Sequence, residues 1–214
     1  MPTPLAPSLT VDALLQAADS ALRALFAPAT AVRNPPGLPH AAPLAEADRR
    51  HVAGLMRVNH AGEISAQALY HGQALMARSA ATREYLLQAA AEEGDHLAWC
   101  EQRLHELNAR TSILNPLWYA GSFAIGAAAA ALSDALSLGF LTETERQVES
   151  HLAEHLGQLP PDDQRSRRIL ETMQSDEIRH ANTADARGAA ELPQWARSGM
   201  ALTSKIMTRL AYWM

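Results

Sequence analysis

Two pairs of side chains in this sequence have the types and the spacing of metal ligands. Each pair reads Glu-x-x-His: Glu93 with His96, and Glu177 with His180. On a helix, residues i and i+3 lie on the same face about one turn apart, so one carboxylate and one imidazole can reach a shared metal ion. A single pair of this kind occurs often by chance and predicts little on its own.

A lone glutamate precedes each pair at nearly the same distance. Glu63 lies thirty residues before Glu93, and Glu145 lies thirty-two residues before Glu177. In an antiparallel helix hairpin, this spacing brings the lone glutamate level with the pair. One glutamate followed by Glu-x-x-His, present twice, is typical of ferritin-like di-iron bundles. Glu149, one turn after Glu145, remains an alternative ligand.

The charge of this residue set predicts which metal it would hold. Four carboxylates match the charge of two Fe(II) ions, whereas four buried carboxylates without a metal would be very unfavourable. Oxygen and nitrogen ligands without sulfur favour iron or manganese over a structural zinc ion. The sequence therefore predicts a dinuclear iron site.

The elements that must position these residues are predicted to be helices. Alanine and leucine dominate the composition, aromatic residues make up only 5%, and no convincing strand period is present. Asn115 and Pro116 begin one helix, a break is expected near Ser133 or Gly139, and Asp162 is the expected N-cap of another. The predicted helices span residues 9–26, 45–78, 81–108, 115–157 with that break, 162–188 and 193–214. We expect an all-α, ferritin-like four-helix bundle with additional N- and C-terminal helices.

Composition sets the domain organisation and excludes several classes of protein. A proline-rich linker over residues 28–43 predicts an N-terminal helix and strap (1–44) ahead of the main helical domain (45–214). A hydrophobic fraction of 48% excludes a disordered chain, and a net charge of −5 argues against a nucleic-acid partner. The single cysteine, Cys100, excludes a disulfide framework and is expected to be buried.

The sequence favours contact with a membrane surface over a membrane span. Residues 1–22 lack Lys and Arg, so they resemble neither a secretory nor a mitochondrial targeting segment. The apolar stretch 117–132 is shorter than the roughly 20 residues that a span needs, and Asp134 follows it. Tryptophans and methionines interspersed with Arg and Lys in residues 193–214 are typical of an interfacial helix.

Several segments together resemble a known family. The segments are 57–63 (Arg-Val-Asn-His-Ala-Gly-Glu), 70–73 (Tyr-His-Gly-Gln), 93–97 (Glu-Gly-Asp-His-Leu), 115–118 (Asn-Pro-Leu-Trp), 150–151 (Ser-His) and 176–180 (Asp-Glu-Ile-Arg-His). They resemble the demethoxyubiquinone hydroxylases of ubiquinone biosynthesis, from about residue 46 to 214. The first 44 residues lie outside that family core, Asn59 stands where some members have Asp, and Leu152 stands where some have Tyr.

The resemblance implies a site and a reaction. Tyr70 and His151 are candidates for residues that act near the centre, with core packing as the alternative for Tyr70 and an exposed helix position as the alternative for His151. Glu93 is preferred to its neighbour Glu92. The implied reaction hydroxylates the ring of 2-polyprenyl-3-methyl-6-methoxy-1,4-benzoquinol with O2 at two iron ions. The implied metal ligands are Glu63, Glu93, His96, Glu145, Glu177 and His180.

The implied substrate also predicts a location. A polyprenylated quinol lives in the bilayer, so we expect peripheral association with the cytoplasmic side of a bacterial inner membrane, with other ubiquinone-biosynthesis proteins as partners.

Two alternatives stay open at this point. One is a ferritin-like iron-storage or peroxide-scavenging protein, and the other is a metal-free quinone carrier. Of the remaining histidines, His60 and His71 are expected at the surface or as caps, and His105 and His155 are expected in solvent.

Overall fold

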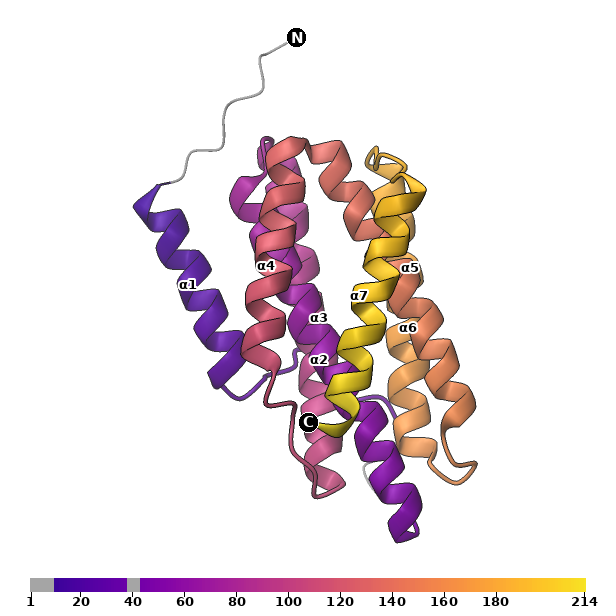
Figure 1. Ribbon diagram of the computed structural model, residues 1–214. Coiled ribbons are helices and arrows are strands. Elements are labelled where there is room, and N and C mark those ends of the chain that lie inside the picture. Colours follow the sequence, from indigo (N-terminus) through magenta and orange to yellow (C-terminus); the bar gives the residue numbers. More distant parts are fainter. Residues whose placement is uncertain (1–9, 38–42) are drawn as a thin grey trace.

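The computed structural model describes residues 10–37 and 43–214, and in these ranges it contains helices and no strand (Figure 1). The all-α prediction is confirmed. The helices are α1 (Val11–Phe26), α2 (Glu46–Met76), α3 (Ala80–Glu106), α4 (Asn115–Leu132), α5 (Asp134–Gln158), α6 (Gln164–Ala186) and α7 (Gln194–Trp213).

Side-chain caps explain where several helices begin. The Thr10 hydroxyl accepts a hydrogen bond from the amide of Ala13 at 3.1 Å and caps α1. Ser133 separates α4 from α5 and caps α5, so the predicted break lies there. The N-cap of α6 is Asp163 and not the predicted Asp162; its carboxylate accepts from the amide of Ser166 at 3.0 Å.

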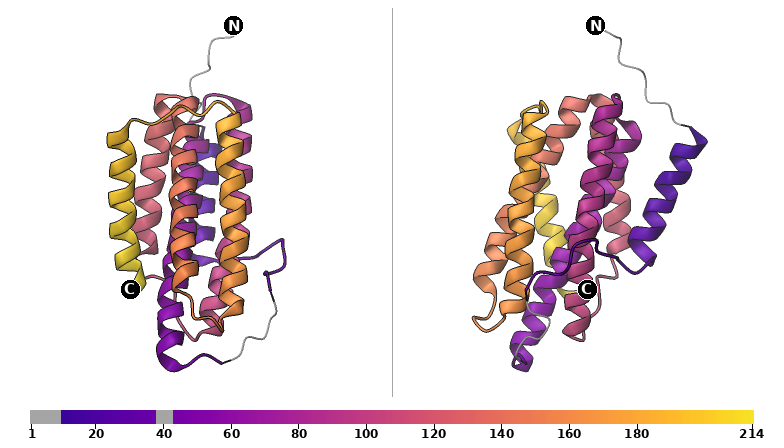
Figure 2. Two further views of the ribbon diagram at one scale, coloured as in Figure 1. Left: turned by 90° about the vertical axis from the view of Figure 1, so that its right-hand side faces the viewer. Right: turned by 180° about the vertical axis from the view of Figure 1, so that it is seen from behind.

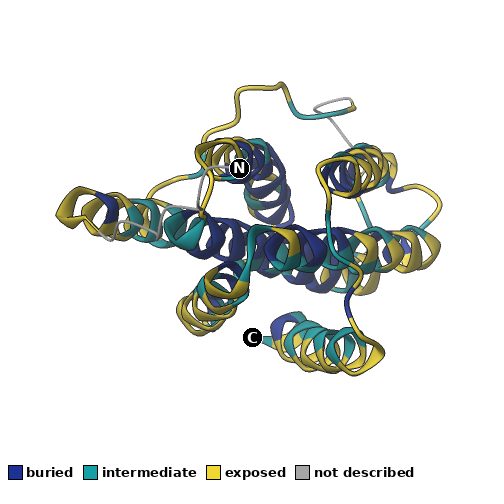
Figure 3. Ribbon diagram, turned by 90° about the horizontal axis from the view of Figure 1, so that it is seen from above, coloured by how far each residue is buried: buried dark blue, intermediate teal, exposed yellow. Residues whose placement is uncertain are grey.

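Two helix hairpins form the four-helix core. The first is α2 with α3 and the second is α5 with α6, and the two hairpins pack together through α2 against α5 and α3 against α6 (Figure 2). The remaining helices cover this core: α4 and α7 pack on α2, and α1 packs against α2 and α4. Buried residues face the interior of this arrangement, and exposed residues line its outer surface (Figure 3).

Glycine residues allow α2 and α4 to pack closely against each other. A Cβ atom on Gly72 would lie 2.2 Å from the carbonyl oxygen of Phe123, and one on Gly126 would lie 2.2 Å from that of Leu69. The two backbones therefore meet without side chains between them, which accounts for glycine inside long helices despite its cost of roughly 1 kcal/mol relative to alanine.

The N-terminal part of the chain is folded onto the bundle. The inner side of α1 packs on Ile64 and Leu97, and residues 28–37 continue as irregular chain. Residues 38–42 of the predicted strap lie outside the described residues, and the domain division at residue 44 stays a prediction. Cys100 is buried as predicted. In the described part of the chain, no helix has the length and apolar character to cross a membrane.

Candidate metal centre

The four core helices bring all six predicted ligand residues into one buried cluster. Glu63 comes from α2, Glu145 from α5, and the two Glu-x-x-His pairs come from α3 and α6. No residue of the cluster is more than 5% exposed. This convergence follows from the geometry of the two hairpins, because the lone glutamate of each hairpin lies level with the pair on the returning helix.

The cluster consists of two overlapping groups, each with ligand atoms within 4.8 Å of one another. One group contains Glu63 and His96, the other contains Glu145 and His180, and both contain Glu93 and Glu177.

The two shared glutamates lie between the histidines. Glu93 places Oε2 2.8 Å from Nδ1 of His96 and Oε1 3.0 Å from Nδ1 of His180. Glu177 places Oε1 3.3 Å from the first nitrogen and Oε2 3.6 Å from the second. Each shared carboxylate thus presents one oxygen to each side, which is the arrangement of a bridging ligand between two metal ions.

Unpartnered polar atoms in the cluster fit a bound cation. Both carboxylate oxygens of Glu177 are buried without a hydrogen-bond donor, as are Oε1 of Glu93 and Nδ1 of His180. Buried polar atoms are nearly always paired, so a group of orphaned oxygens at one place is what a hard or borderline metal ion would satisfy.

The pKa shifts of the cluster residues also fit a bound cation. Burial raises the pKa of Glu63 well above its ordinary value, and the nearby Glu93 and Glu177 raise it further. Burial and the same two carboxylates raise the pKa of Glu145. Burial lowers the pKa of His180, but the close carboxylates of Glu177 and Glu93 outweigh it and raise the pKa to about 11. Burial thus disfavours the negative charges of Glu63 and Glu145, and the carboxylates favour a positive charge on His180; two divalent cations would supply positive charge at this place.

Both cluster histidines are held from outside by carboxylates on the opposite helix. Nε2 of His96 on α3 lies 3.0 Å from Oδ2 of Asp176 on α6, and Nε2 of His180 on α6 lies 2.9 Å from Oε2 of Glu92 on α3. A hydrogen bond at Nε2 fixes the ring so that Nδ1 faces the cluster.

Sequence reasoning missed this crossed pair of hydrogen bonds. The only local signal is that each outer acid directly precedes a cluster glutamate, as in Glu92-Glu93 and Asp176-Glu177. Glu92 lies one turn before His96 on the same helix, yet its carboxylate contacts His180 on α6. Its loss is therefore expected to affect the cluster through that ring.

Tyr70 and His151 both lie close to the cluster. The Tyr70 hydroxyl is buried and donates a hydrogen bond to Oε1 of Glu145. His151 lines a small pocket of about 40 Å³ whose wall includes Glu63, and its Nε2 is buried without a partner. Burial lowers the pKa of His151, so its ring is neutral near pH 7.

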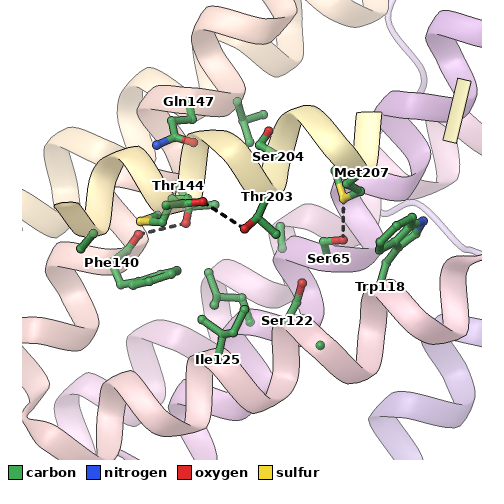
Figure 4. Close-up of a pocket in the computed structure, with 18 of the residues that line it drawn as sticks. Ser65, Trp118, Ser122, Ile125, Phe140, Thr144, Gln147, Thr203, Ser204 and Met207 are labelled. Atoms are coloured by element: carbon green, nitrogen blue, oxygen red, sulfur yellow. Dashed lines mark hydrogen bonds between the residues drawn. The ribbon is translucent and has the colours of Figure 1, made fainter. Parts of the chain in front are cut away.

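A much larger apolar cavity of about 610 Å³ adjoins that small pocket. Its walls come from α2, α4, α5 and α7, and Figure 4 shows Ser65 and Ser122 on one side with Thr203 and Met207 on the other. The two cavities share Gly62, Gln147, Val148, Ser204 and Met207 as lining residues. An apolar space therefore leads from between α4 and α7 toward Glu63.

Three other predictions about polar residues have clear outcomes. Glu149 lies outside the cluster and accepts a hydrogen bond from Gln174 at 2.9 Å. His60 and His155 are buried, so their expected exposure is wrong: Nδ1 of His155 lies 2.9 Å from Oδ1 of Asn59, and His60 lies against Asn115. Each has an asparagine partner on a neighbouring helix, which allows burial of a neutral ring.

The chain is similar to proteins of a known family. The model of the family described as "Ubiquinone biosynthesis protein COQ7" matches residues 50–211. The chain is 55% identical over 202 residues to the 3-demethoxyubiquinol 3-hydroxylase of Bordetella avium (strain 197N), a match that covers 94% of each protein. It is 56% identical over 206 residues to that of Dechloromonas aromatica (strain RCB), covering 95% of this chain and 99% of the relative. It is 61% identical over 173 residues to that of Ralstonia pickettii (strain 12J), covering 81% and 80%. The chain therefore belongs to the family of the ubiquinone biosynthesis protein COQ7.

Proposed function

We propose that this protein is a di-iron monooxygenase that hydroxylates the ring of a polyprenylated demethoxyubiquinol in ubiquinone biosynthesis. The observation that carries this proposal is the convergence of four carboxylates and two imidazoles beside a small pocket that Glu63 lines and that adjoins a large apolar cavity. The relatives named 3-demethoxyubiquinol 3-hydroxylase support the choice of reaction. An iron-storage protein would share the six ligands but would not need the cavity.

The proposed ligand roles follow the two overlapping groups. Glu93 and Glu177 would bridge two iron ions, because each presents one oxygen to each side of the cluster. Glu63 and His96 would complete one side, and Glu145 and His180 the other. When bound, two Fe(II) ions supply electrons to O2, so that one oxygen atom enters the ring, the other leaves as water, and an external reductant restores the electrons.

The surrounding residues would orient the substrate and keep water away. The hydroxyl of Tyr70 holds the carboxylate of Glu145 in place from its buried side. The neutral His151 ring faces the small pocket beside Glu63. Its Nε2 can accept a hydrogen bond from a quinol hydroxyl there, or donate one to it, depending on the tautomer. The apolar cavity between α4 and α7 would take the start of the prenyl tail, which orders the ring against the cluster.

We also propose that the protein binds peripherally to the cytoplasmic side of a bacterial inner membrane. α7 carries exposed apolar side chains, among them Trp195, Leu202 and Trp213, together with Lys205 and no acidic residue. Exposed apolar side chains of α4, among them Leu117 and Ile125, extend this surface beside the cavity. Such a surface suits insertion at the boundary between headgroups and acyl chains, where a lipid-borne quinol enters the cavity. Other ubiquinone-biosynthesis proteins are proposed as partners on the strength of the family alone.

The ligand assignment is tested by comparing Glu145→Gln with Glu149→Gln. Glutamine keeps the size of glutamate and still accepts from Tyr70, but it loses the charge that a metal ion needs. We expect Glu145→Gln to lower bound iron from two ions per chain to one or fewer, whereas Glu149→Gln leaves it unchanged. Iron analysis of protein made in iron-replete cells checks this, and an equal loss in both variants would contradict the assignment.

Product analysis tests the reaction itself. The purified full-length protein is loaded with Fe(II) and given a chemical reductant, O2 and a short-tailed demethoxyubiquinol. We expect a product with one additional ring hydroxyl, whose oxygen carries the label when ¹⁸O₂ is supplied. Consumption of O2 or peroxide without a ring product would favour iron storage or peroxide scavenging, and an absence of iron would favour a metal-free carrier.

The role of the cavity is tested by filling it. Ser122 lines the cavity, so Ser122→Phe is expected to lower kcat/KM for a long-tailed quinol by about tenfold, a loss of about 1.4 kcal/mol in transition-state binding. Iron content should not change. Ala120→Phe, at an exposed position on the same helix outside the cavity, is the matched control. Equal kcat/KM in both variants would rule out the cavity as the tail site.

Membrane association is tested with vesicles that contain anionic phospholipid. The double substitution Trp195→Ser and Leu202→Ser is expected to weaken co-sedimentation by about tenfold or more, because burying each large apolar side chain contributes about 1.5–3 kcal/mol. Ile178→Ser removes an exposed apolar side chain from α6, away from α7, and should leave binding intact. Retention of the double variant at the wild-type level would disprove the proposed surface.

A further inference from the structure

The irregular segment that follows α1 lies against the outer side of the metal-ligand cluster. It is joined to α3 at two places: the amide of Ala29 donates to Oε2 of Glu101 at 2.9 Å, and the amide of Val32 donates to Oδ1 of Asp95 at 2.6 Å. It is joined to α6 through Arg165, which donates to the carbonyl oxygen of Pro36 at 2.8 Å. The segment thus connects the two helices that carry the Glu-x-x-His pairs.

Arg33 is the one residue of this segment whose side chain contacts both α3 and α6 in the described structure. Its Nε donates to Oδ2 of Asp95 on α3 at 2.6 Å, and its Nη1 donates to Oδ2 of Asp176 on α6 at 2.8 Å. The guanidinium carbon lies 4.8 Å from the centre of the Trp99 ring, and the Trp99 indole donates to the carbonyl oxygen of Arg33 at 3.2 Å. Arg33 is therefore fixed on several sides although it is partly exposed.

The carboxylate that Arg33 binds is the one that holds His96. Oδ2 of Asp176 accepts from Nη1 of Arg33 and lies 3.0 Å from Nε2 of His96. Its other oxygen, Oδ1, accepts from Arg179 at 3.1 Å. With an arginine on each side, Asp176 is held at both of its oxygens, and the position of Oδ2 sets the orientation of the His96 ring.

The outer acid of the second histidine lacks this additional contact. Glu92, which contacts His180, is bound by Arg179 at 3.1 Å, and no residue of the N-terminal segment reaches it in the described structure. Glu92 is also more exposed than Asp176, at 31% against 13% of the side chain. The centre is thus supported unequally, and the extra support lies on the His96 side.

We propose that Arg33 is a positioning residue for the metal centre: it holds Asp176 so that His96 keeps Nδ1 directed at the cluster. This inference rests on the proposed di-iron site. It goes beyond the matched family model, which begins at residue 50, because Arg33 lies before that point. Lysine cannot replace arginine here, since a single ammonium group cannot bind Asp95 and Asp176 with the two separate nitrogens of a planar fork.

Metal binding tests the proposal without using activity. The full-length protein is stripped of metal with a chelator and titrated with Co(II), whose visible absorption reports the ligand geometry. We expect wild type to bind two ions per chain. In Arg33→Ala one of the two ions should bind about 10- to 100-fold more weakly, with a changed spectrum, while the other binds as in wild type. Arg33→Lys should resemble Arg33→Ala.

Glu101→Ala is the control for a general effect of loosening the segment from α3. It removes the contact that holds the segment at Ala29 but touches neither Asp176 nor His96, so both ions should bind as in wild type. If Arg33→Ala and Arg33→Lys bind both ions with wild-type affinity and spectrum, or if Glu101→Ala weakens binding as much, the positioning role is wrong and the proposed function stands. A wild-type chain that binds no metal would overturn both.

Discussion

Four carboxylates buried at one point in a helical bundle dominate the physics of this protein. A carboxylate removed from water must be paired or neutralised, and in the described part of the chain two histidines accompany these four carboxylates. Most other features near the cluster serve the same requirement. Tyr70 donates to Glu145, Asp176 and Glu92 hold the two rings from outside, and bound cations would supply the remaining charge.

The local parts of this arrangement could be predicted from the sequence. Helix bounds follow from periodicity, caps and prolines, and the six cluster residues follow from a spacing of three within a helix and about thirty across a hairpin. The error at Asp162 is small, because two neighbouring aspartates can each cap α6 and the backbone places Asp163 there. The choice of Glu145 over Glu149 needed the helix to be placed, since both lie on α5 one turn apart.

The long-range polar contacts could not be predicted from one sequence. His96 and Asp176 are eighty residues apart, and their contact depends on how α3 and α6 pack. The burial of His155 depends on Asn59 of α2 in the same way. The segment after α1 has no periodicity to read, so the position of Arg33 against α6 had no signal at all in the sequence. Patterns within one helix or hairpin can be read from the chain, whereas contacts between elements distant in sequence need the structure.

The glycine contact between α2 and α4 has a consequence for the cavity. Because backbone meets backbone at Gly72 and Gly126, α4 cannot move closer to α2, and this wall of the cavity is fixed by main-chain contact. α7 forms the opposite wall, and Ala211 is its only buried residue in the structure described. A long flexible guest would therefore find room on the α7 side of the cavity, where the wall consists of side chains such as Met207 and Thr203 and not of packed backbone.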